Sequence, residues 1–222
     1  QEVSQRNSDR CEELLMNLLR EYIRELLTES IDPKMVELID RLEEKGWKVK
    51  LLKDRAILFN PAGLGDSNVR VNQGTIGWST PDEYDFEGPD GYGSCLGANI
   101  IDSSYAAGGL GPVLYDVAIE ASGGKGLASD RFSVSSEATN VWDYYMNNRP
   151  DVQVIQMDNK KNLLTPGDGD NCDQNVSTLD VGTKLKHGWV ESSLSKVYKK
   201  AGTPVIDELE RRGLLMRRKT RG

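Results

Sequence analysis

Residues 106–112 read Ala-Ala-Gly-Gly-Leu-Gly-Pro and separate a predicted strand, residues 95–105, from a predicted helix, residues 112–122. Glycine permits backbone conformations with positive φ and lets a ligand approach the main chain closely. Pro112 suits the first turn of a helix, where a missing N–H leaves no bond unmade. The N–H groups before it, together with the helix dipole, form a candidate site for a phosphate or diphosphate. A plain structural turn is the alternative.

The glycine pattern excludes two common nucleotide-binding motifs. It lacks the Gly-Lys-Ser/Thr ending of a P-loop, and it does not open the first βαβ unit of the chain, as a nicotinamide-binding turn would. A second helix is expected from Ser135 or Ser136 to about residue 147, and a strand over residues 152–157. We therefore expect residues 94–158 to form one compact α/β unit.

The flanking segments predict further helices and strands. Residues 9–28 show an amphipathic helical pattern that packs either on this protein or on a partner. A second helix is expected after Asp32, which caps it; Pro33 lies in its first turn, and Gly46 ends it. Further predicted elements are strands at 47–52, 56–59, 69–71 and 75–78, loops at 79–93 and 159–188, and short helices at 194–200 and 204–212, the last capped by Thr203. The expected domains are 1–30, an amphipathic helix; 31–158, the α/β domain; and 159–222, a loop and helical extension with a basic tail.

Composition narrows the class of protein. The chain has 222 residues, of which 37% are hydrophobic and 28% charged, as in a soluble globular protein. No stretch approaches the roughly 20 apolar residues of a spanning helix, and the polar residues 1–10 do not resemble a secretory signal. A net charge of −7 argues against general nucleic-acid binding. The basic tail is the exception, because it either frays into solvent or docks on an acidic partner or packaged nucleic acid; its residues are Arg211, Arg212, Arg217, Arg218, Lys219 and Arg221.

Neither the cysteines nor the acidic loop residues predict a metal site. Three widely spaced cysteines make neither a disulfide framework nor a zinc cluster and favour a reducing compartment; they are Cys11, Cys95 and Cys172. The single histidine, His187, supports no Ser-His-Asp or Cys-His set. Asp168, Asp170 and Asp173 suggest calcium only faintly, since the glycine and terminal glutamate of a hand-type loop are missing. We expect no metal.

The run from Gly109 to Asp158 resembles the cofactor half of the Gcn5-related N-acetyltransferase fold. In that family a strand leads into a Gln/Arg-x-x-Gly-x-Gly/Ala loop, followed by a helix, a strand and a second helix that bears Ala and Tyr. Gly109 and Gly111 match the two small positions, and Ala138 resembles a second-helix element. Ala106 departs from the family, because Gln or Arg usually stands there. The resemblance implies an α/β (α+β) fold with a mixed, mostly antiparallel central sheet flanked by helices, with N-terminal helices and a helical C-terminal extension.

The same resemblance implies a site for acetyl-CoA. The loop would hold the cofactor diphosphate, and the implied cofactor-binding residues are Ile101, Gly108, Gly109, Leu110, Gly111 and Pro112. A tyrosine would protonate the thiolate leaving group, and Tyr144 or Tyr145 fits that position. Asp102, on the strand before the loop, is the first candidate for the base that deprotonates the amine. Asp116 comes next, although its place on the helix favours a structural role. Tyr115, Trp142 and Trp78 are expected in the core rather than around a substrate.

Three functions follow as hypotheses. Segments such as Tyr115-Asp116 and Asp130-Arg131 also resemble acetyltransferase-like proteins of tailed bacteriophages. The first hypothesis is therefore a phage-encoded acyl-CoA-dependent N-acyltransferase, either free in the host or packaged in the virion. The second is a non-catalytic head or tail protein that keeps the fold and binds virion partners through its N-terminal helix. The third is a host-directed effector. The expected location is the host cytoplasm or the virion, with no membrane partner and no secretion; the amine acceptor is not specified.

Overall fold

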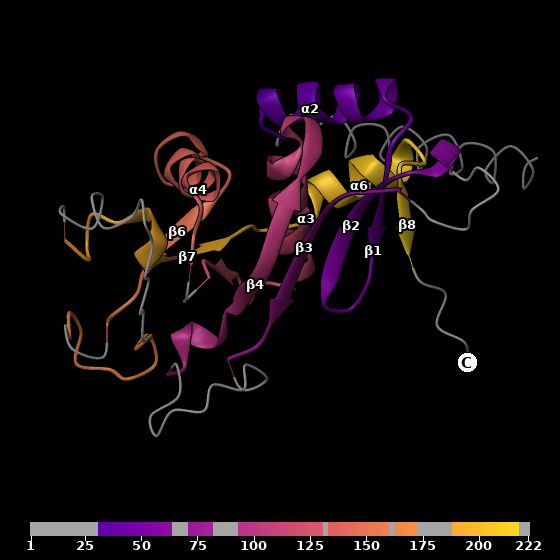
Figure 1. Ribbon diagram of the computed structural model, residues 1–222. Helices are drawn as coiled ribbons and strands as arrows, with labels where there is room; N and C mark the ends of the chain where they lie inside the picture. Colours follow the sequence, from indigo (N-terminus) through magenta and orange to yellow (C-terminus); the bar gives the residue numbers. More distant parts are fainter. Residues whose placement is uncertain are drawn as a thin grey trace, which may run out of the picture.

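The computed structural model describes residues 31–63, 71–81, 93–130, 133–159, 163–172 and 188–217. The fold is mixed α/β, with a mostly antiparallel eight-stranded sheet in the order β6-β7-β5-β4-β3-β2-β1-β8 (Figure 1). The predicted helix over residues 9–28 lies outside the described residues. The strands are β1 (Lys48–Leu51), β2 (Arg55–Asn60), β3 (Val71–Ser79), β4 (Asn99–Ala106), β5 (Leu127–Ala128), β6 (Gln153–Gln156), β7 (Lys196–Lys199) and β8 (Leu215–Arg217). The α-helices are α2 (Pro33–Glu44), α3 (Gly111–Ala121), α4 (Ser136–Asn148) and α6 (Pro204–Arg211).

Helix α2 confirms the predicted N-terminal cap and C-terminal glycine. The Asp32 carboxylate accepts hydrogen bonds from the N–H groups of Lys34 and Met35 at 3.0 and 3.3 Å, and Pro33 occupies the first turn. Gly46 ends the helix with φ of 63°, a conformation that glycine adopts without strain. The buried side chains of Met35, Ile39 and Leu42 form the face that packs on the core. In Figure 1, α2 lies across the end of α3.

Strands β1 to β4 form an antiparallel meander. The two strands expected at 69–71 and 75–78 are one strand, β3, and an irregularity in its pairing with β2 absorbs the extra residue. The strand expected at 95–105 begins later, because Cys95 and Leu96 have positive φ values of 44° and 57° in a short 3-10 turn. The following strand, β4, starts at Asn99.

Helix α3 joins β4 to β5, which are parallel, and Ser135 caps α4 as predicted by accepting a hydrogen bond from the Ala138 N–H at 3.2 Å. The helix predicted at 194–200 is wrong. Residues 193–195 form one 3-10 turn, and β7 follows between β5 and β6, antiparallel to both. Sheet pairing on both sides of this strand overrides the local helical preference of a short window.

The C-terminal part continues the same sheet. Strand β8 pairs in parallel with β1 at the edge. Arg212 forms ion pairs with Asp40 and Glu43 of α2, so this part of the basic segment contacts acidic groups of its own chain. Residues 218–222 lie outside the described residues.

One buried core unites the helices and the sheet, and it includes Trp142, Tyr115 and Trp78 as predicted for aromatic core residues. A smaller cluster on the other side of β4 and β5 contains a disulfide between Cys95 and Cys172, 77 residues apart in the sequence. The interpretation that the cysteines form no such bond is therefore wrong. The interpretation rested on the odd number and wide spacing of the cysteines, which do not show how the chain folds. The fold brings the 93–97 turn against the 163–172 segment through backbone hydrogen bonds, such as that from the Cys95 N–H to Asn171 O at 3.0 Å.

Candidate functional site

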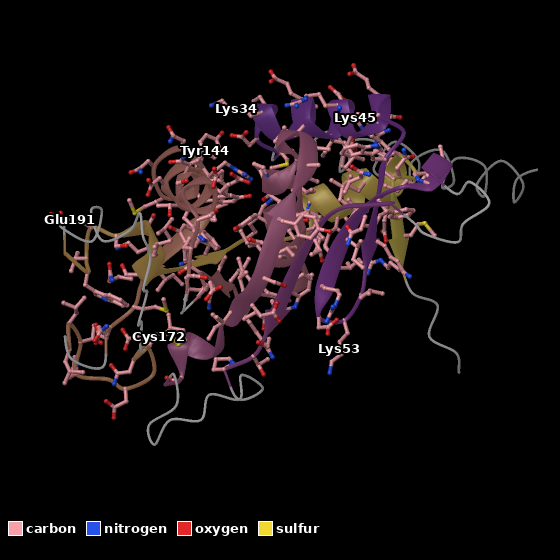
Figure 2. The ribbon with its side chains drawn as sticks, in the orientation of Figure 1. Lys34, Lys45, Lys53, Tyr144, Cys172 and Glu191 are labelled. Atoms are coloured by element: carbon pink, nitrogen blue, oxygen red, sulfur yellow. A yellow bond between two sulfur atoms is a disulfide. The ribbon has the colours of Figure 1, made fainter. Side chains whose placement is uncertain are left out.

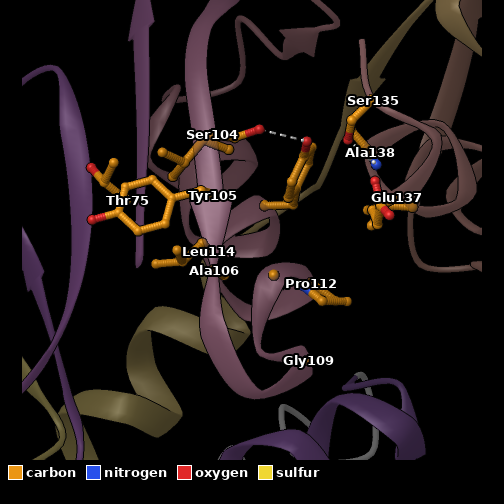
Figure 3. Close-up of a pocket in the computed structure, with 14 residues that line it drawn as sticks. Thr75, Ser104, Tyr105, Ala106, Gly109, Pro112, Leu114, Ser135, Glu137 and Ala138 are labelled. Carbon is orange, nitrogen blue, oxygen red and sulfur yellow. Dashed lines mark hydrogen bonds between the residues drawn. The ribbon is translucent and has the colours of Figure 1, made fainter. Parts of the chain in front are cut away.

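A cavity of about 360 Å³ opens between the second half of β4, the start of α3 and the start of α4 (Figure 3). One wall is Ser104, Tyr105 and Ala106 of β4, and the facing wall comes from residues 135–141 of α4 and its cap. Gly109, Gly111 and Pro112 line the end formed by the glycine turn. The lining is mainly carbon, with Ile76, Leu114 and Val141 among its members. The cavity therefore suits a ligand that has apolar groups.

The cavity exists because β4 and β5 separate. Strand β4 pairs with β3 as far as Ala106, but its pairing with β5 ends at Ile100. In the part of the chain that the structure describes, no strand continues along the β5 side of β4 from residue 101 to 106. An extended ligand in the cavity can therefore hydrogen-bond to a strand edge with which no described strand pairs.

The glycine turn forms the end of the cavity. Gly108 and Gly109 have φ values of 65° and 68°, which side chains disfavour. Leu110 stands at the N-cap of α3, where it supplies no side-chain oxygen to the first N–H groups. Its own N–H bonds weakly to Ala107 O at 3.4 Å. The first turn of α3 is thus without a side-chain cap beside the cavity, as expected of an anion site.

Two cationic side chains, Arg41 of α2 and Lys45 at its C-cap, lie against this turn. Arg41 Nη2 donates to Gly108 O at 2.8 Å, and a Cβ placed on Gly108 would lie 3.5 Å from Lys45 Cε. Lys45 extends from the end of α2 in Figure 2. Sequence reasoning missed both residues, although their spacing of four on one helix face was a signal. Glu137 on the opposite wall is ionised, because its own N–H and the hydroxyls of its two preceding serines lower its pKa.

The predicted cofactor residues do not all reach the cavity. Gly109, Gly111 and Pro112 line it, whereas the side chains of Ile101 and Leu110 are buried in the core. Gly108 is not part of the lining, and its carbonyl is the group held by Arg41.

Neither predicted catalytic tyrosine lines the cavity. The Tyr144 hydroxyl donates to Asp32 Oδ1 at 3.3 Å, and the Lys34 ammonium lies 4.7 Å from its ring centre (Figure 2). Tyr145 is fully buried, and its hydroxyl donates to Pro112 O at 3.2 Å. Burial raises the pKa of Tyr145 well above 10, which favours its neutral form. The catalytic role of either residue stays a prediction.

Two tyrosines line the cavity, the exposed Tyr105 and the buried Tyr115. The Tyr115 hydroxyl lies 3.1 Å from Ser104 Oγ, the interaction dashed in Figure 3. Burial raises its pKa, so the hydroxyl is protonated and able to donate at neutral pH. Sequence analysis placed Tyr115 in the core. It is indeed only 5% exposed, and no sequence signal showed that its hydroxyl faces a cavity.

Asp102 lies in a second, polar cavity of about 570 Å³, together with Lys53, Lys125 and Asn99. It sits at the irregularity where β3 pairing passes from Ser103 to Ile101. Ser103 Oγ donates to its carboxylate at 3.0 Å. Asp102 is thus on the same strand as the first cavity but outside its lining.

Asp116, the second candidate base, belongs to a buried ionic network rather than to either cavity. Arg149 donates to both of its carboxylate oxygens at 2.9 and 3.1 Å, and Lys200 donates to it at 3.0 Å. Lys200 also donates to Glu120 at 2.6 Å, and Arg149 to Asp151 at 2.7 Å. The structural role predicted for Asp116 agrees with these bonds, because its charge is already neutralised.

Glu120 extends that network to α6. Its carboxylate accepts from the N–H groups of Val205 and Ile206 at 3.1 and 2.8 Å. The predicted cap, Thr203, instead donates its hydroxyl to Asp207 at 3.1 Å and makes no cap bond. A carboxylate from a distant helix therefore replaces the local cap.

No family model, curated protein or solved structure matches the chain. Within the described ranges, no helix has the length and apolar character needed to cross a bilayer.

Proposed function

We propose that the protein is an acyl-CoA-dependent N-acyltransferase. One observation carries the proposal. Among the described residues, no strand pairs with one edge of the second half of β4, and that edge opens onto a cavity that ends at a glycine-rich helix start without a side-chain cap. The order β4, glycine turn, α3, β5, α4 supports it as well, because this is the order implied by the resemblance to the Gcn5-related N-acetyltransferases. A phage origin stays a prediction from that resemblance.

The residues around the cavity fit acetyl-CoA chemically. At the start of α3, the Leu110 and Val113 N–H groups bond to Ala107 O and Leu110 O, and Pro112 has none. The Gly111 N–H is therefore the group proposed to meet the diphosphate, and Arg41 and Lys45 place positive charge beside it. The unpaired edge of β4 offers backbone groups to the amides of the pantetheine arm. The bound cofactor would supply an acyl group activated as a thioester.

Transfer of that acyl group to an amine requires two proton movements. The ammonium form of the acceptor must lose a proton before its nitrogen forms the new C–N bond, and the thiolate that leaves must gain one. Tyr115 lines the cavity, and its hydroxyl lies 3.1 Å from Ser104 Oγ, so it joins Tyr144 and Tyr145 as a candidate acid. Asp102, on the same strand, stays the candidate base.

Calorimetry with acetyl-CoA tests the proposal. We expect binding in the micromolar range, and Gly111→Trp should raise the Kd at least about tenfold. This variant should fold, because a Cβ on Gly111 meets only the Ala106 Cβ at 3.9 Å and φ is not positive there. The matched control is Gly167→Trp, at an exposed position with nothing within 4 Å of the new Cβ, and its Kd should be unchanged. A folded wild-type protein that binds no acetyl-CoA would contradict the proposal.

A non-catalytic virion protein with the same architecture is the second candidate. It is favoured by Ala106 in the place of Gln or Arg, and by the packing of Tyr144 and Tyr145 away from the cavity. Recovery of the chain from purified particles, together with no acetyl-CoA binding, would decide for it.

A further inference from the structure

The polar cavity of about 570 Å³ lies at the C-terminal end of α3, away from the glycine turn that precedes this helix. The end of β3 and the start of β4 line it, together with the β1–β2 turn, the last residues of α3 and Lys125, which follows that helix. It shares no lining residue with the cavity beside the glycine turn. The polar cavity is therefore a separate candidate site.

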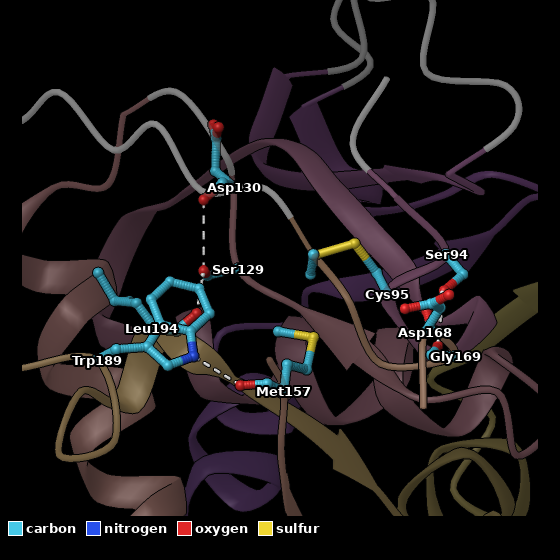
Figure 4. Close-up of a disulfide and its surroundings, with 10 residues drawn as sticks. Ser94, Cys95, Ser129, Asp130, Met157, Asp168, Gly169, Trp189 and Leu194 are labelled. Carbon is cyan, nitrogen blue, oxygen red and sulfur yellow. Dashed lines mark hydrogen bonds between the residues drawn. A yellow bond between two sulfur atoms is a disulfide. The ribbon is translucent and has the colours of Figure 1, made fainter. Parts of the chain in front are cut away.

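Two buried side chains of the lining, Trp78 and Asn99, lie on the face of the sheet that α3 covers. Trp78 pairs with Ile101, and both belong to the main core with α3. Because side chains alternate along a strand, Asn99 shares the face of Ile101, whereas Ile100 belongs to the smaller cluster with the disulfide (Figure 4). Asn99 and Trp78 are therefore diagonal neighbours on adjacent strands, and both line the polar cavity.

Both side chains carry polar groups that the described part of the chain leaves without a hydrogen-bond partner. Asn99 is 6% exposed and Trp78 is 5% exposed, and neither the Asn99 amide nor the Trp78 indole N–H forms a hydrogen bond with a described residue. Neither group is sealed from open space, because the sealed and unbonded polar atoms of the described side chains lie in the 158–171 segment. The amide and the indole N–H therefore face the cavity that both residues line. Such groups favour a ligand that completes their hydrogen bonds.

The charges around the polar cavity favour an anion. Lys53 and Lys125 line it and form no ion pair within the described residues; Lys53 lies at the tip of the β1–β2 hairpin in Figure 2. The two carboxylates of the lining already have partners. Asp54 pairs with Arg55 at 3.1 Å, and Asp102 accepts a hydrogen bond from the next side chain at 3.0 Å. With Arg55 included, positive charges outnumber negative ones at this cavity.

The C-terminal end of α3 opposes an anion only weakly, because the carbonyls of its last turn are in use. The Ser122 N–H donates to Ala118 O at 3.1 Å, and Ser122 Oγ donates to Ile119 O at 2.6 Å. The Gly123 N–H donates to Glu120 O at 3.3 Å. These bonds offset the partial negative charge of the helix end.

We infer that the polar cavity binds the carboxylate or phosphate group of a small molecule. An indole N–H and a lysine ammonium are donors only, so the ligand atoms that meet them must be acceptors. Carboxylate and phosphate oxygens are acceptors that also carry the negative charge the lysines favour. The inference does not depend on acyl transfer, because it uses none of the residues proposed to bind acetyl-CoA.

NMR of the indole N–H groups tests the inference, because each of the four tryptophans gives one signal and Trp78→Phe identifies that of Trp78. At constant ionic strength, we expect sodium phosphate or sodium acetate to shift the Trp78 signal saturably, with a Kd of roughly 1–10 mM for so small an ion. Sodium chloride should leave it in place. The anion with the lower Kd then gives the class of ligand.

The Trp47 signal separates this site from the glycine turn. A Cβ placed on Gly108 would lie 3.6 Å from Trp47 Cζ3, so phosphate bound at that turn should shift the Trp47 signal. A response of Trp47 without Trp78 would contradict the inference and leave the proposed diphosphate site standing. A response of Trp78 without Trp47 would support the inference even if the protein binds no acetyl-CoA.

Two variants weaken the site in different ways. Asn99→Asp keeps the shape of the side chain but places a carboxylate against the anion, so the Kd should rise at least about tenfold. The matched control is Asn72→Asp at the other end of β3, where Oδ1 can still accept from the Gly74 N–H at 3.0 Å and the Kd should not change. Lys125→Gln, at an exposed position, should raise the Kd about threefold. Lys50→Gln removes the same charge outside the lining and should leave the Kd unchanged.

Three outcomes would overturn the inference. They are no saturable shift of the Trp78 signal with either anion, an equal shift of all four indole signals, and an unchanged Kd in folded Asn99→Asp and Lys125→Gln variants.

Discussion

Helix α3 meets two very different surroundings along its length. At its first turn the N-cap is a leucine, no described strand pairs with the neighbouring edge of β4, and a cavity lies open. Further along, Asp116 and Glu120 are buried among Arg149, Lys200 and the N–H groups of α6. The number of charged side chains alone would have indicated the second region as the functional site. Backbone groups without a described hydrogen-bond partner indicate the first region instead. The buried charges of the second region are paired with one another, so they stabilise the fold.

The largest expected effect comes from breaking the network. Lys200→Met leaves Asp116 and Glu120 with less compensating charge, and we expect a loss of about 3–5 kcal/mol in the free energy of unfolding. Urea denaturation measures it. Lys199→Met, one position earlier and half-buried, should lose less than about 1 kcal/mol. A loss below about 1 kcal/mol in Lys200→Met would mean that the network does not hold α3, β7 and α6 together.

A smaller effect should appear in the pH dependence of stability. Burial raises the pKa of Glu120 to about 7, partly offset by the Lys200 charge, against 4.5 for the free side chain. Between these values the folded state holds a proton that the unfolded state releases, so the free energy of unfolding should fall as pH rises. We expect a decrease on the order of 1–3 kcal/mol between about pH 4.5 and 7.5. Glu120→Gln should flatten this part of the profile; an identical slope in both proteins would assign the dependence to other groups.

The smallest effects distinguish the two tyrosines. Tyr145→Phe removes the buried donor to Pro112 O and should lower the free energy of unfolding by about 1–2 kcal/mol. Tyr144→Phe removes a longer, partly exposed bond to Asp32 and should change it by less than about 0.5 kcal/mol. If either hydroxyl is the catalytic acid, its variant should lower kcat more than cofactor affinity. A kcat equal to that of the wild type in both variants would remove both tyrosines from the mechanism and leave Tyr115 as the candidate.

The sequence predicted the helices best, because their ends carry local chemistry. Asp32, Pro33 and Gly46 bound α2, and Ser135 caps α4. The glycine turn was likewise located correctly between a strand and α3. These signals lie within a few residues of the element that they define, so one sequence is enough to find them.

The sequence could not predict what depends on distant contacts. Strand β5 has two residues, too few for a periodic pattern, and β7 is a strand only because it lies between two others. Arg41 meets Gly108 across 67 positions, and the disulfide joins cysteines 77 positions apart. The same holds for Tyr115, whose burial was predicted but whose hydroxyl faces a cavity made by three separate elements.

The place of β7 in the sheet has a consequence for how the protein is made on the ribosome. Its neighbours β5 and β6 precede it in the chain, and no described strand other than β7 pairs with β6. Until residue 199 has been synthesised, the sheet carries a gap, and β5 offers an unpaired edge to other nascent chains. Completion of the sheet therefore waits for residues 196–199, and we expect the edge of β5 to stay open to wrong pairing until they have been synthesised.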